Sequence, residues 1–217
     1  NTRARQTYEY VKDPGQYYEM HYASLYNYFR DQGNDAATSY SKAVSTLTSN
    51  NIGGLGYNVF NVPAGQQLIG TNGKLNPNAT LGNVVTYKGQ DYYLTPDDYM
   101  DAAYNNSMRQ EYNLSVSGGT DKSSFYASVN YLDNEGITAN SNYERLAGRL
   151  KADFQVNSNM KFGANMTYTH FASNAIGEDG SGGSSGNIFA YATGIAPIYP
   201  LFIRDGQGNI MKDDNGF

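Results

Sequence analysis

The side chains best suited to catalysis or metal binding are few and scattered in this sequence. Its two histidines, His21 and His170, lie far apart, and neither has the orienting acid or further ligands that a catalytic dyad or metal site requires. We therefore interpret both as structural or interfacial histidines. The absence of cysteine excludes disulfides, thiolate metal ligands and cysteine nucleophiles. No catalytic residue, metal site or cofactor is expected.

Three polar segments have the composition of ligand-binding loops but not the spacing. Residues 205–209 (DGQGN) and 213–216 (DDNG) lack the D-x-[DN]-x-[DN]-G pattern with a later Glu that calcium loops use. Residues 180–186 (GSGGSSG) lack the Gly-Lys-Ser/Thr ending of a phosphate loop. We interpret the first two as turns and the third as a flexible loop, with Glu178 and Asp179 at its solvated tip.

The composition excludes several classes of protein. The 217 residues carry 15 Lys and Arg against 20 Asp and Glu, a net charge of −5, whereas a nucleic-acid binder needs a basic surface. No stretch approaches the ~18 consecutive apolar residues of a transmembrane helix. A transmembrane barrel is not excluded, because its strands are apolar on one face only. The sequence starts without Met or a signal peptide, so we expect a processed product or part of something longer.

The first half of the chain mixes helices with a long polar segment. Asp13 followed by proline suits the start of a helix, and apolar residues at helical spacing predict one over about 14–31. A weaker pattern predicts a second helix over about 35–48. Residues 50–93 are rich in Gly, Asn and turn signals and are expected to form one long loop. Residues 95–98 (TPDD) then indicate the start of a short helix.

The clearest pattern is a run of four amphipathic strands. Apolar and polar residues alternate with a period of two over 111–117, 123–132, 143–156 and 160–171. The connections alternate between short and long, as in outer-membrane barrels. A soluble antiparallel sheet with one face on a core gives the same alternation, so both interpretations stay open. Four strands cannot close a barrel, so in a membrane they must belong to a larger one.

In a membrane, the two faces of these strands would meet different surroundings. The polar face would line a lumen, and the apolar face would contact lipid. The predicted lumen-facing residues are Arg145, Arg149, Lys151, Asp153, Lys161 and Asn165. The predicted lipid-facing residues are Leu114, Val116, Phe125, Val129, Leu146, Leu150, Phe154, Phe162 and Met166.

Tyrosines are the remaining candidates for binding. An interfacial aromatic girdle of a barrel explains those at or near strand ends, which are Tyr112, Tyr131, Tyr143 and Tyr168. A second set precedes the first clear strand, where it could stack on sugars or contact a partner, since Tyr is common at recognition surfaces. These candidate ligand or partner contacts are Tyr87, Tyr92 and Tyr93.

Several segments resemble one family. Residues 107–122 (SMRQEYNLSVSGGTDK) resemble the region after the plug domain in SusC/RagA-type TonB-dependent outer-membrane transporters of Bacteroidetes. Residues 125–137 (FYASVNYLDNEGI), 143–145 (YER) and 160–165 (MKFGAN) fit the same family. The resemblance is dense over about 95–171, looser over 8–94 and thin beyond 172.

The resemblance implies an all-β fold class, an antiparallel transmembrane β-barrel segment with a long, partly helical extracellular loop. The segment would be a partial arc of a plugged barrel of about 22 strands. Residues 1–108 would hold the end of the first barrel strand and the long extracellular loop with short helices. Residues 109–171 would form four antiparallel transmembrane strands, and 172–217 a Gly/Ser-rich extracellular loop with the segment after it.

The resemblance also implies a function, which is import of oligosaccharides or peptides across the bacterial outer membrane. Such importers act with a SusD-like surface lipoprotein and draw energy from TonB through an N-terminal part not seen in this sequence. They are not enzymes, need no cofactor and do not bind nucleic acid. The segment alone is not expected to transport. Two alternatives stay open: a soluble Tyr-rich carbohydrate-binding β-module and a non-transporting surface adhesin.

Overall fold

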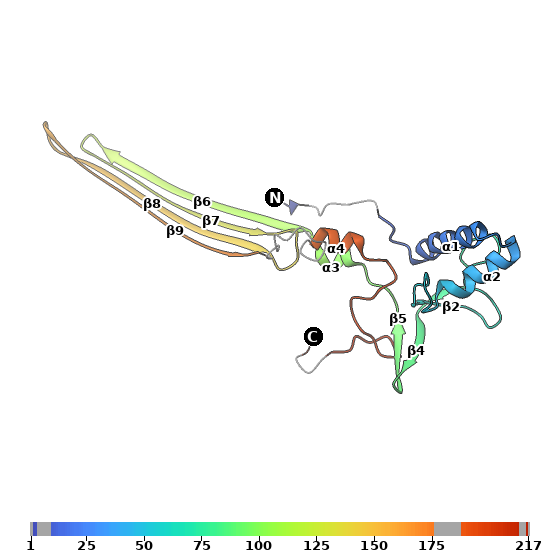
Figure 1. The fold of residues 1–217 in the computed structure, drawn as a ribbon. Helices are drawn as coiled ribbons and strands as arrows, with labels where there is room; N and C mark the ends of the chain where they lie inside the picture. Colours follow the sequence, from blue (N-terminus) through green and yellow to red (C-terminus); the bar gives the residue numbers. More distant parts are fainter. Residues whose placement is uncertain (1, 4–9, 176–187, 213–215, 217) are drawn as a thin grey trace. The chain divides into compact units, whose positions relative to one another are not determined.

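A computed structural model describes residues 2–3, 10–175, 188–212 and 216. The chain divides into two compact units (Figure 1). The sheet unit comprises Asn1–Tyr8 with Met100–Ala190, and the helical unit comprises Glu9–Tyr99 with Tyr191–Phe217. No helix in the described parts of the chain is long and apolar enough to cross a membrane.

The sheet unit is built on one antiparallel sheet. Its strands are β1 (Thr2–Arg3), β6 (Ser107–Thr120), β7 (Ser123–Glu135), β8 (Asn142–Asn157) and β9 (Met160–Asn174). They lie in the order β1-β6-β7-β8-β9. Figure 1 shows β6 to β9 side by side as one long, curved ribbon of sheet. The predicted fold, an antiparallel sheet forming a partial arc, is confirmed.

The four predicted strands form, and all but two of their ends extend beyond the alternating pattern. Polar residues continue the ladder, as where Gln110 pairs with Asp133 and Asp133 with Glu144. Two-residue turns join β6 to β7 and β8 to β9. Backbone pairing therefore reaches past the last apolar side chain, which alternation of side chains cannot reveal.

The helical unit begins with the two predicted helices, α1 (Pro14–Asp31) and α2 (Ala36–Leu47). Each starts where a carboxylate caps it. Asp13 accepts a hydrogen bond from the N–H of Gly15 at 2.8 Å, and Asp35 accepts one from the N–H of Thr38 at 2.7 Å. These caps satisfy backbone donors that have no partner inside the helix. Both helix predictions are confirmed.

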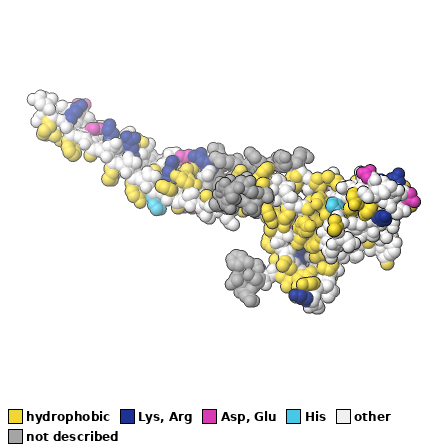
Figure 2. Space-filling model, viewed as in Figure 1, with side chains coloured by type: hydrophobic (Ala, Val, Ile, Leu, Met, Phe, Trp, Pro, Cys, Tyr) yellow, Lys and Arg dark blue, Asp and Glu magenta, His cyan; other side chains and the backbone are white. Residues whose placement is uncertain are grey.

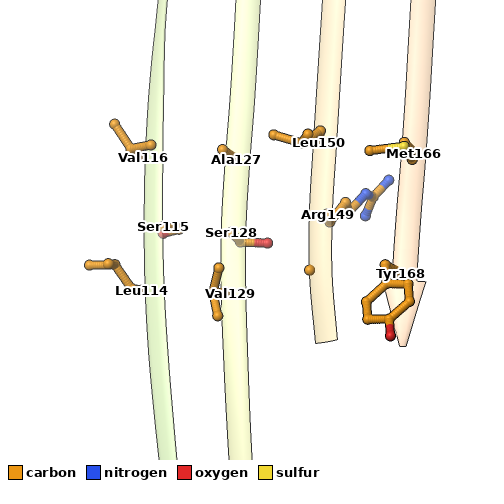
Figure 3. A pocket seen from close by; sticks show the side chains of 11 residues that line it. Leu114, Ser115, Val116, Ala127, Ser128, Val129, Arg149, Leu150, Met166 and Tyr168 are labelled. Carbon is orange, nitrogen blue, oxygen red and sulfur yellow. The ribbon is translucent and has the colours of Figure 1, made fainter. Parts of the chain in front are cut away.

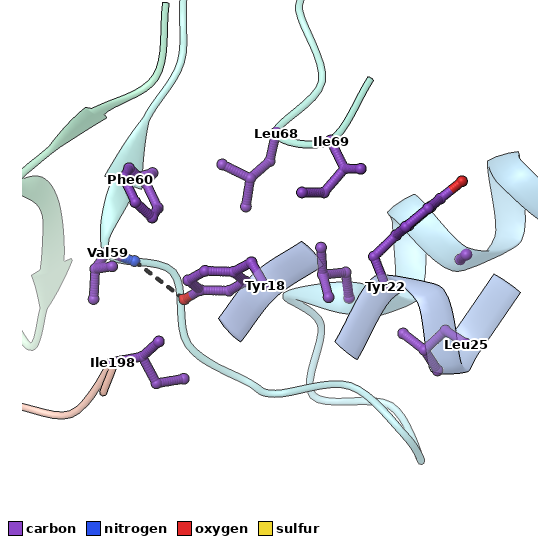
Figure 4. Close-up of a cluster of buried hydrophobic side chains, with 10 residues drawn as sticks. Tyr18, Tyr22, Leu25, Val59, Phe60, Leu68, Ile69 and Ile198 are labelled. Atoms are coloured by element: carbon purple, nitrogen blue, oxygen red, sulfur yellow. Dashed lines mark hydrogen bonds between the residues drawn. The ribbon is translucent and has the colours of Figure 1, made fainter. Parts of the chain in front are cut away.

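One buried cluster holds the helical unit together (Figure 4). Tyr18 is fully buried, and its hydroxyl donates to the carbonyl of Tyr57 at 2.6 Å and accepts from the N–H of Val59 at 3.3 Å. A single side chain thus fixes the chain at 57–59 against α1. Ile198, far along the sequence, joins the same cluster and is also fully buried. The C-terminal segment is therefore part of this core.

The expectation of one long loop over residues 50–93 is wrong. The segment contains β2 (Phe60–Asn61) paired with β3 (Thr80–Leu81), and β4 (Asn83–Tyr87) paired with β5 (Gln90–Leu94). Lys88 and Gly89 form the turn between β4 and β5 with φ of 51° and 81°. Positive φ at both central residues is typical of a two-residue hairpin turn, which the sequence usually marks with Asn-Gly or Asp-Gly. Because the pair here is Lys-Gly, this turn has no clear sign in the sequence.

Two short helices complete the fold, α3 (Tyr99–Ala103) and α4 (Ile188–Gly194). α3 starts later than the TPDD sequence at 95–98 suggests. The Asp97 carboxylate does not cap it, because it is bound by Arg204 and by the backbone N–H groups of Leu201 and Phe202. The Asp97 carboxylate, which the local sequence assigns to a helix start, thus binds residues more than one hundred positions away instead.

Candidate functional site

The first candidate site is the sheet of β6 to β9, whose two faces differ in chemistry. The register places apolar side chains opposite one another, with Leu114 against Val129 and Leu150 against Met166. All of the predicted lipid-facing residues share this face and are exposed, Leu114 to 75%. Figure 2 shows hydrophobic side chains along one border of the sheet and charged ones along the other.

A hollow on the apolar face shows the same division at close range (Figure 3). Its volume is about 400 Å³. Leu114, Leu150 and Met166 point to one side of the sheet, and Ser128 and Arg149 point to the other. The hollow lies between exposed side chains, and of the lining residues on this face Tyr168 alone has a polar side-chain atom, whereas small-molecule sites combine a few placed polar groups. It therefore belongs to the apolar face as a whole.

The apolar band has a definite height. On β8 the band runs from Leu146 at least to Phe154, eight residues apart, which is about 27 Å along a strand, and the exposed Val156 follows. At a tilt of about 40° this projects to about 21 Å, near the ~25 Å apolar band of outer-membrane barrels. Beyond Leu146 the next row on this face is polar on three strands, with Gln110, Asp133 and Glu144, and has Ala172 on β9. The band thus ends abruptly.

Aromatic side chains mark that end of the band, with one correction. Tyr112 and Tyr131 lie opposite each other in the last apolar row, with their rings stacked at 6.5 Å between centroids. Tyr168 lies in the adjacent row, opposite Gly148. Tyr143 was expected to belong to this girdle, but it lies on the polar face and stacks on Phe171 at 6.2 Å. Its odd position on β8 places it with the arginines.

The predicted lumen-facing residues lie together on the opposite face. On β8 and β9 they include two close contacts, Lys151 with Asp153 at 3.3 Å and the Arg149 Nε donating to Asn165 at 3.4 Å. The guanidinium of Arg145 donates to Asn130 at 3.0 Å. The remaining member is Lys161, opposite Gln155. Arg145, Arg149, Lys151 and Asp153 thus each contact a neighbouring side chain on the same face.

The second candidate site is a groove on the helical unit, with a volume of about 370 Å³. It gathers all three loop tyrosines singled out from the sequence, Tyr87, Tyr92 and Tyr93. Val85 and Tyr92 are paired across the β4–β5 hairpin, and Tyr87 shares their face two residues on. Tyr57 and Phe202 complete the aromatic lining, although sequence reasoning did not find them. Both come from segments far from the hairpin.

An ion pair fixes one wall of this groove. Arg204 and Asp97 approach to 2.5 Å, and both side chains are largely buried. Burial raises the pKa of Asp97, but the hydrogen bonds from Arg204 and from two backbone N–H groups outweigh it and hold the pKa below its ordinary value. The carboxylate stays ionised, so it holds the segment at 201–204 beside β5, where Arg204 also accepts a hydrogen bond from the N–H of Tyr93.

The remaining candidates have structural roles or lie outside the described residues. The Nε2 of His21 is 2.7 Å from the Gly53 carbonyl, and His170 lies opposite Leu146 on the apolar face. Asp205 accepts hydrogen bonds from the N–H groups of Gln207 and Asn209, which confirms a turn at 205–209. The described residues include no group of three or more possible metal ligands. Glu178, Asp179, the Gly/Ser run at 180–186 and residues 213–215 lie outside the described residues.

Comparison with known proteins gives sequence relatives of one kind. TonB-dependent receptor P39 of Formosa agariphila is 38% identical over 110 residues, covering 51% of this chain and 10% of the relative. Receptors P3 and P26 of the same organism are 27% and 29% identical, covering 54% and 44% of this chain. The chain spans about a tenth of the length of these relatives. No family model matches it.

Among solved structures, the RagAB peptide transporter aligns with a TM-score of 0.45 and 24% identity, covering 54% of this chain and 13% of that one. The three sequence relatives, by contrast, align with up to 38% identity over about half of the chain, and each is named a TonB-dependent receptor. Over about half its length, the chain is therefore homologous to TonB-dependent receptors of Bacteroidetes, which confirms the resemblance found in its sequence.

Proposed function

We propose that the chain is a segment of an outer-membrane importer of the TonB-dependent class. The observation that carries this proposal is the exposed apolar face of β6 to β9, with its abrupt polar border. An uncovered apolar face of this extent is rare on a soluble monomer and marks a surface that contacts lipid or protein. The homology to TonB-dependent receptors favours lipid.

In this proposal the sheet forms part of a barrel wall. The apolar row from Leu114 to Tyr168 faces lipid, and the row from Ser115 to Thr167, which includes Arg149, faces the lumen. The outer edge of β9 must then pair with a further strand, because unpaired backbone groups in hydrocarbon cost several kcal/mol each. Residues 1–108 supply the end of one strand and the first extracellular loop, 109–171 the wall, and 172–217 the next loop and the segment after it.

The partners and cargo follow from the same proposal. The whole protein would import oligosaccharides or peptides, take energy from TonB through its N-terminal part, and work with a SusD-like lipoprotein at the cell surface. We expect no catalytic residues in it, because import moves a solute without making or breaking bonds. The helical unit, as an extracellular loop, would contact the lipoprotein, or the solute before it enters the lumen.

Fractionation of cells that express the full-length protein tests the membrane assignment. We expect it in the outer-membrane pellet, resistant to carbonate washing and released only by detergent. Recovery in the soluble fraction would contradict the proposal and favour the soluble carbohydrate-binding module.

Uptake tests the transport assignment separately. A strain lacking the gene should lose growth on the oligosaccharide or peptide that the protein imports, and a strain lacking TonB should show the same defect. A protein that stays in the outer membrane while growth on every tested substrate is unchanged would favour the adhesin instead.

A further inference from the structure

We propose that the groove lined by Tyr57, Tyr87, Tyr92, Tyr93 and Phe202, hereafter the tyrosine groove, binds an uncharged sugar chain. Its volume of about 370 Å³ lies within the range of about 300–1,000 Å³ typical of small-molecule sites. Such sites combine an apolar lining with a few polar groups that orient the ligand. Tyrosine offers both, since its ring is apolar and its hydroxyl donates and accepts hydrogen bonds.

The hydroxyls of two groove tyrosines differ from those of three tyrosines that fix the backbone of the helical unit. Tyr18, Tyr40 and Tyr99 each donate to a backbone carbonyl, at 2.6–2.8 Å. Within the described residues, the hydroxyls of Tyr87 and Tyr92 have no hydrogen-bond partner in the protein. These three tyrosines are satisfied internally, whereas the groove presents the rings of Tyr87 and Tyr92 together with unused hydroxyls. A ligand with an apolar ring face and a rim of hydroxyl groups complements both.

The charge of the groove selects among polar ligands. Arg204 is its ionisable basic lining residue, and Asp97 neutralises it through hydrogen bonds to both terminal nitrogens. A phosphate or carboxylate would find no free cation among the described lining residues, and Lys88, outside the lining, has its Nζ over the ring of Tyr87 at 5.2 Å from the ring centroid. An ammonium group would find no free anion there either. The lining therefore favours an uncharged ligand.

The backbone of the groove argues against an extended peptide. A peptide bound to a strand adds to a free sheet edge through main-chain hydrogen bonds. β5 has none to offer here, because β4 pairs with one edge. On its other edge the N–H of Tyr93 donates to Arg204 at 3.2 Å, and Tyr92 forms a bridge to Asp205. Along β5, recognition is therefore left to side chains, which suits a sugar.

Calorimetric titration of the full-length protein in detergent tests the proposal with three neutral hexasaccharides: α-1,4-linked glucose, β-1,4-linked glucose and β-1,4-linked mannose. We expect binding of at least one. Tyr87→Ala and Tyr92→Ala should each weaken it at least about tenfold, the loss expected for a dominant aromatic contact. Tyr92→Trp, which keeps a ring, should retain more of the affinity. Tyr28→Ala, an exposed tyrosine on α1 outside the groove, is the matched control and should bind as the wild type does.

Three outcomes would overturn the proposal. One is no binding of any hexasaccharide to the wild-type protein. Another is unchanged affinity in both alanine variants when their folding, checked by near-ultraviolet dichroism, is intact. The third is tight binding of a decaproline peptide that Tyr92→Ala abolishes while the sugars do not bind, which would assign the groove to peptides.

This proposal rests on the importer function only in taking the sugar to be imported cargo. Sugar binding by the groove and import by the whole protein can therefore fail separately. If uptake and TonB dependence hold but the alanine variants bind normally, the tyrosine groove is not the sugar site. If the groove binds sugar but the gene is not needed for uptake of any substrate, the importer proposal fails instead.

Discussion

Leu150→Arg is the substitution that most directly tests which face of the sheet meets lipid. Leu150 lies on β8, four residues from Leu146 and four from Phe154, so it is central in the apolar band. Each interval is about 14 Å along the strand and about 10 Å along the membrane normal at a tilt of about 40°. The side chain would therefore lie near the bilayer midplane.

The expected cost follows from that depth. An arginine on the lipid face costs about 2–4 kcal/mol at the midplane and about 0–1 kcal/mol near the interface. Leu150→Arg should thus lower the folding equilibrium constant about 30-fold to about 700-fold, since 1.4 kcal/mol is a factor of ten. Leu146→Arg, in the outermost apolar row beside the polar row of Asp133 and Glu144, should cost at most about 1 kcal/mol.

The measurement is reversible unfolding of the full-length protein in lipid vesicles, followed as a function of guanidinium concentration. Asn113→Arg is the control for the opposite face, because Asn113 precedes the apolar Leu114 and lies on the same face as Glu111. We expect the cost of Leu150→Arg to exceed that of both other variants by at least about 1 kcal/mol.

Two results would refute the reasoning. Equal costs for Leu150→Arg and Asn113→Arg would show that the two faces meet similar surroundings. Equal costs for Leu150→Arg and Leu146→Arg, with folding that needs no lipid, would show a band covered by protein, as in a soluble sheet.

Three further substitutions test the helical unit. Tyr18→Phe leaves the buried N–H of Val59 without its hydroxyl acceptor and should cost about 1–3 kcal/mol, measured by chemical unfolding. Asp35→Ala removes the cap of α2 and should cost about 1 kcal/mol, seen as faster amide exchange in its first turn. The third concerns Asp97, whose pKa is raised by burial but lowered more by Arg204 and backbone N–H groups. Because its pKa is depressed on folding, its stabilisation is present above the ordinary value of 3.8 and is lost as pH falls below it. In the wild type, this loss should appear as a change in tyrosine near-ultraviolet dichroism when the pH is lowered from about 6 to about 2. Asp97→Asn should abolish the change, because the amide does not titrate.

Elements set by neighbouring residues could be predicted from the sequence. The start of α1 follows from Asp13 and the proline after it, and the strands β6 to β9 follow from alternation that the register preserves across four strands. The division into apolar and polar faces needs nothing beyond that period of two. Tyr143 is the exception. It was assigned to the girdle because it lies near a strand end, but its odd position on β8 places it on the polar face.

Elements set by distant residues could not be predicted. The β4–β5 hairpin turns at Lys88 and Gly89, a pair without the usual turn signal. The tyrosine groove was half found, because Tyr87, Tyr92 and Tyr93 lie close together in the sequence, whereas Phe202 reaches it through a segment far along the chain. The Asp97–Arg204 pair joins residues 107 positions apart, so no local pattern marks it.

The order of the strands also bears on how the sheet forms. β6 to β9 are a meander, in which every pairing is between sequence neighbours joined by two to six residues. Pairing of β1 with β6 brings Thr2 beside Met108 and closes a loop of about one hundred residues. Such a loop costs about 2 kcal/mol more in chain entropy than a loop of ten. The hairpins of the meander should therefore zip together first, and β1 should join last, after α1, α2 and their core have already compacted the intervening chain.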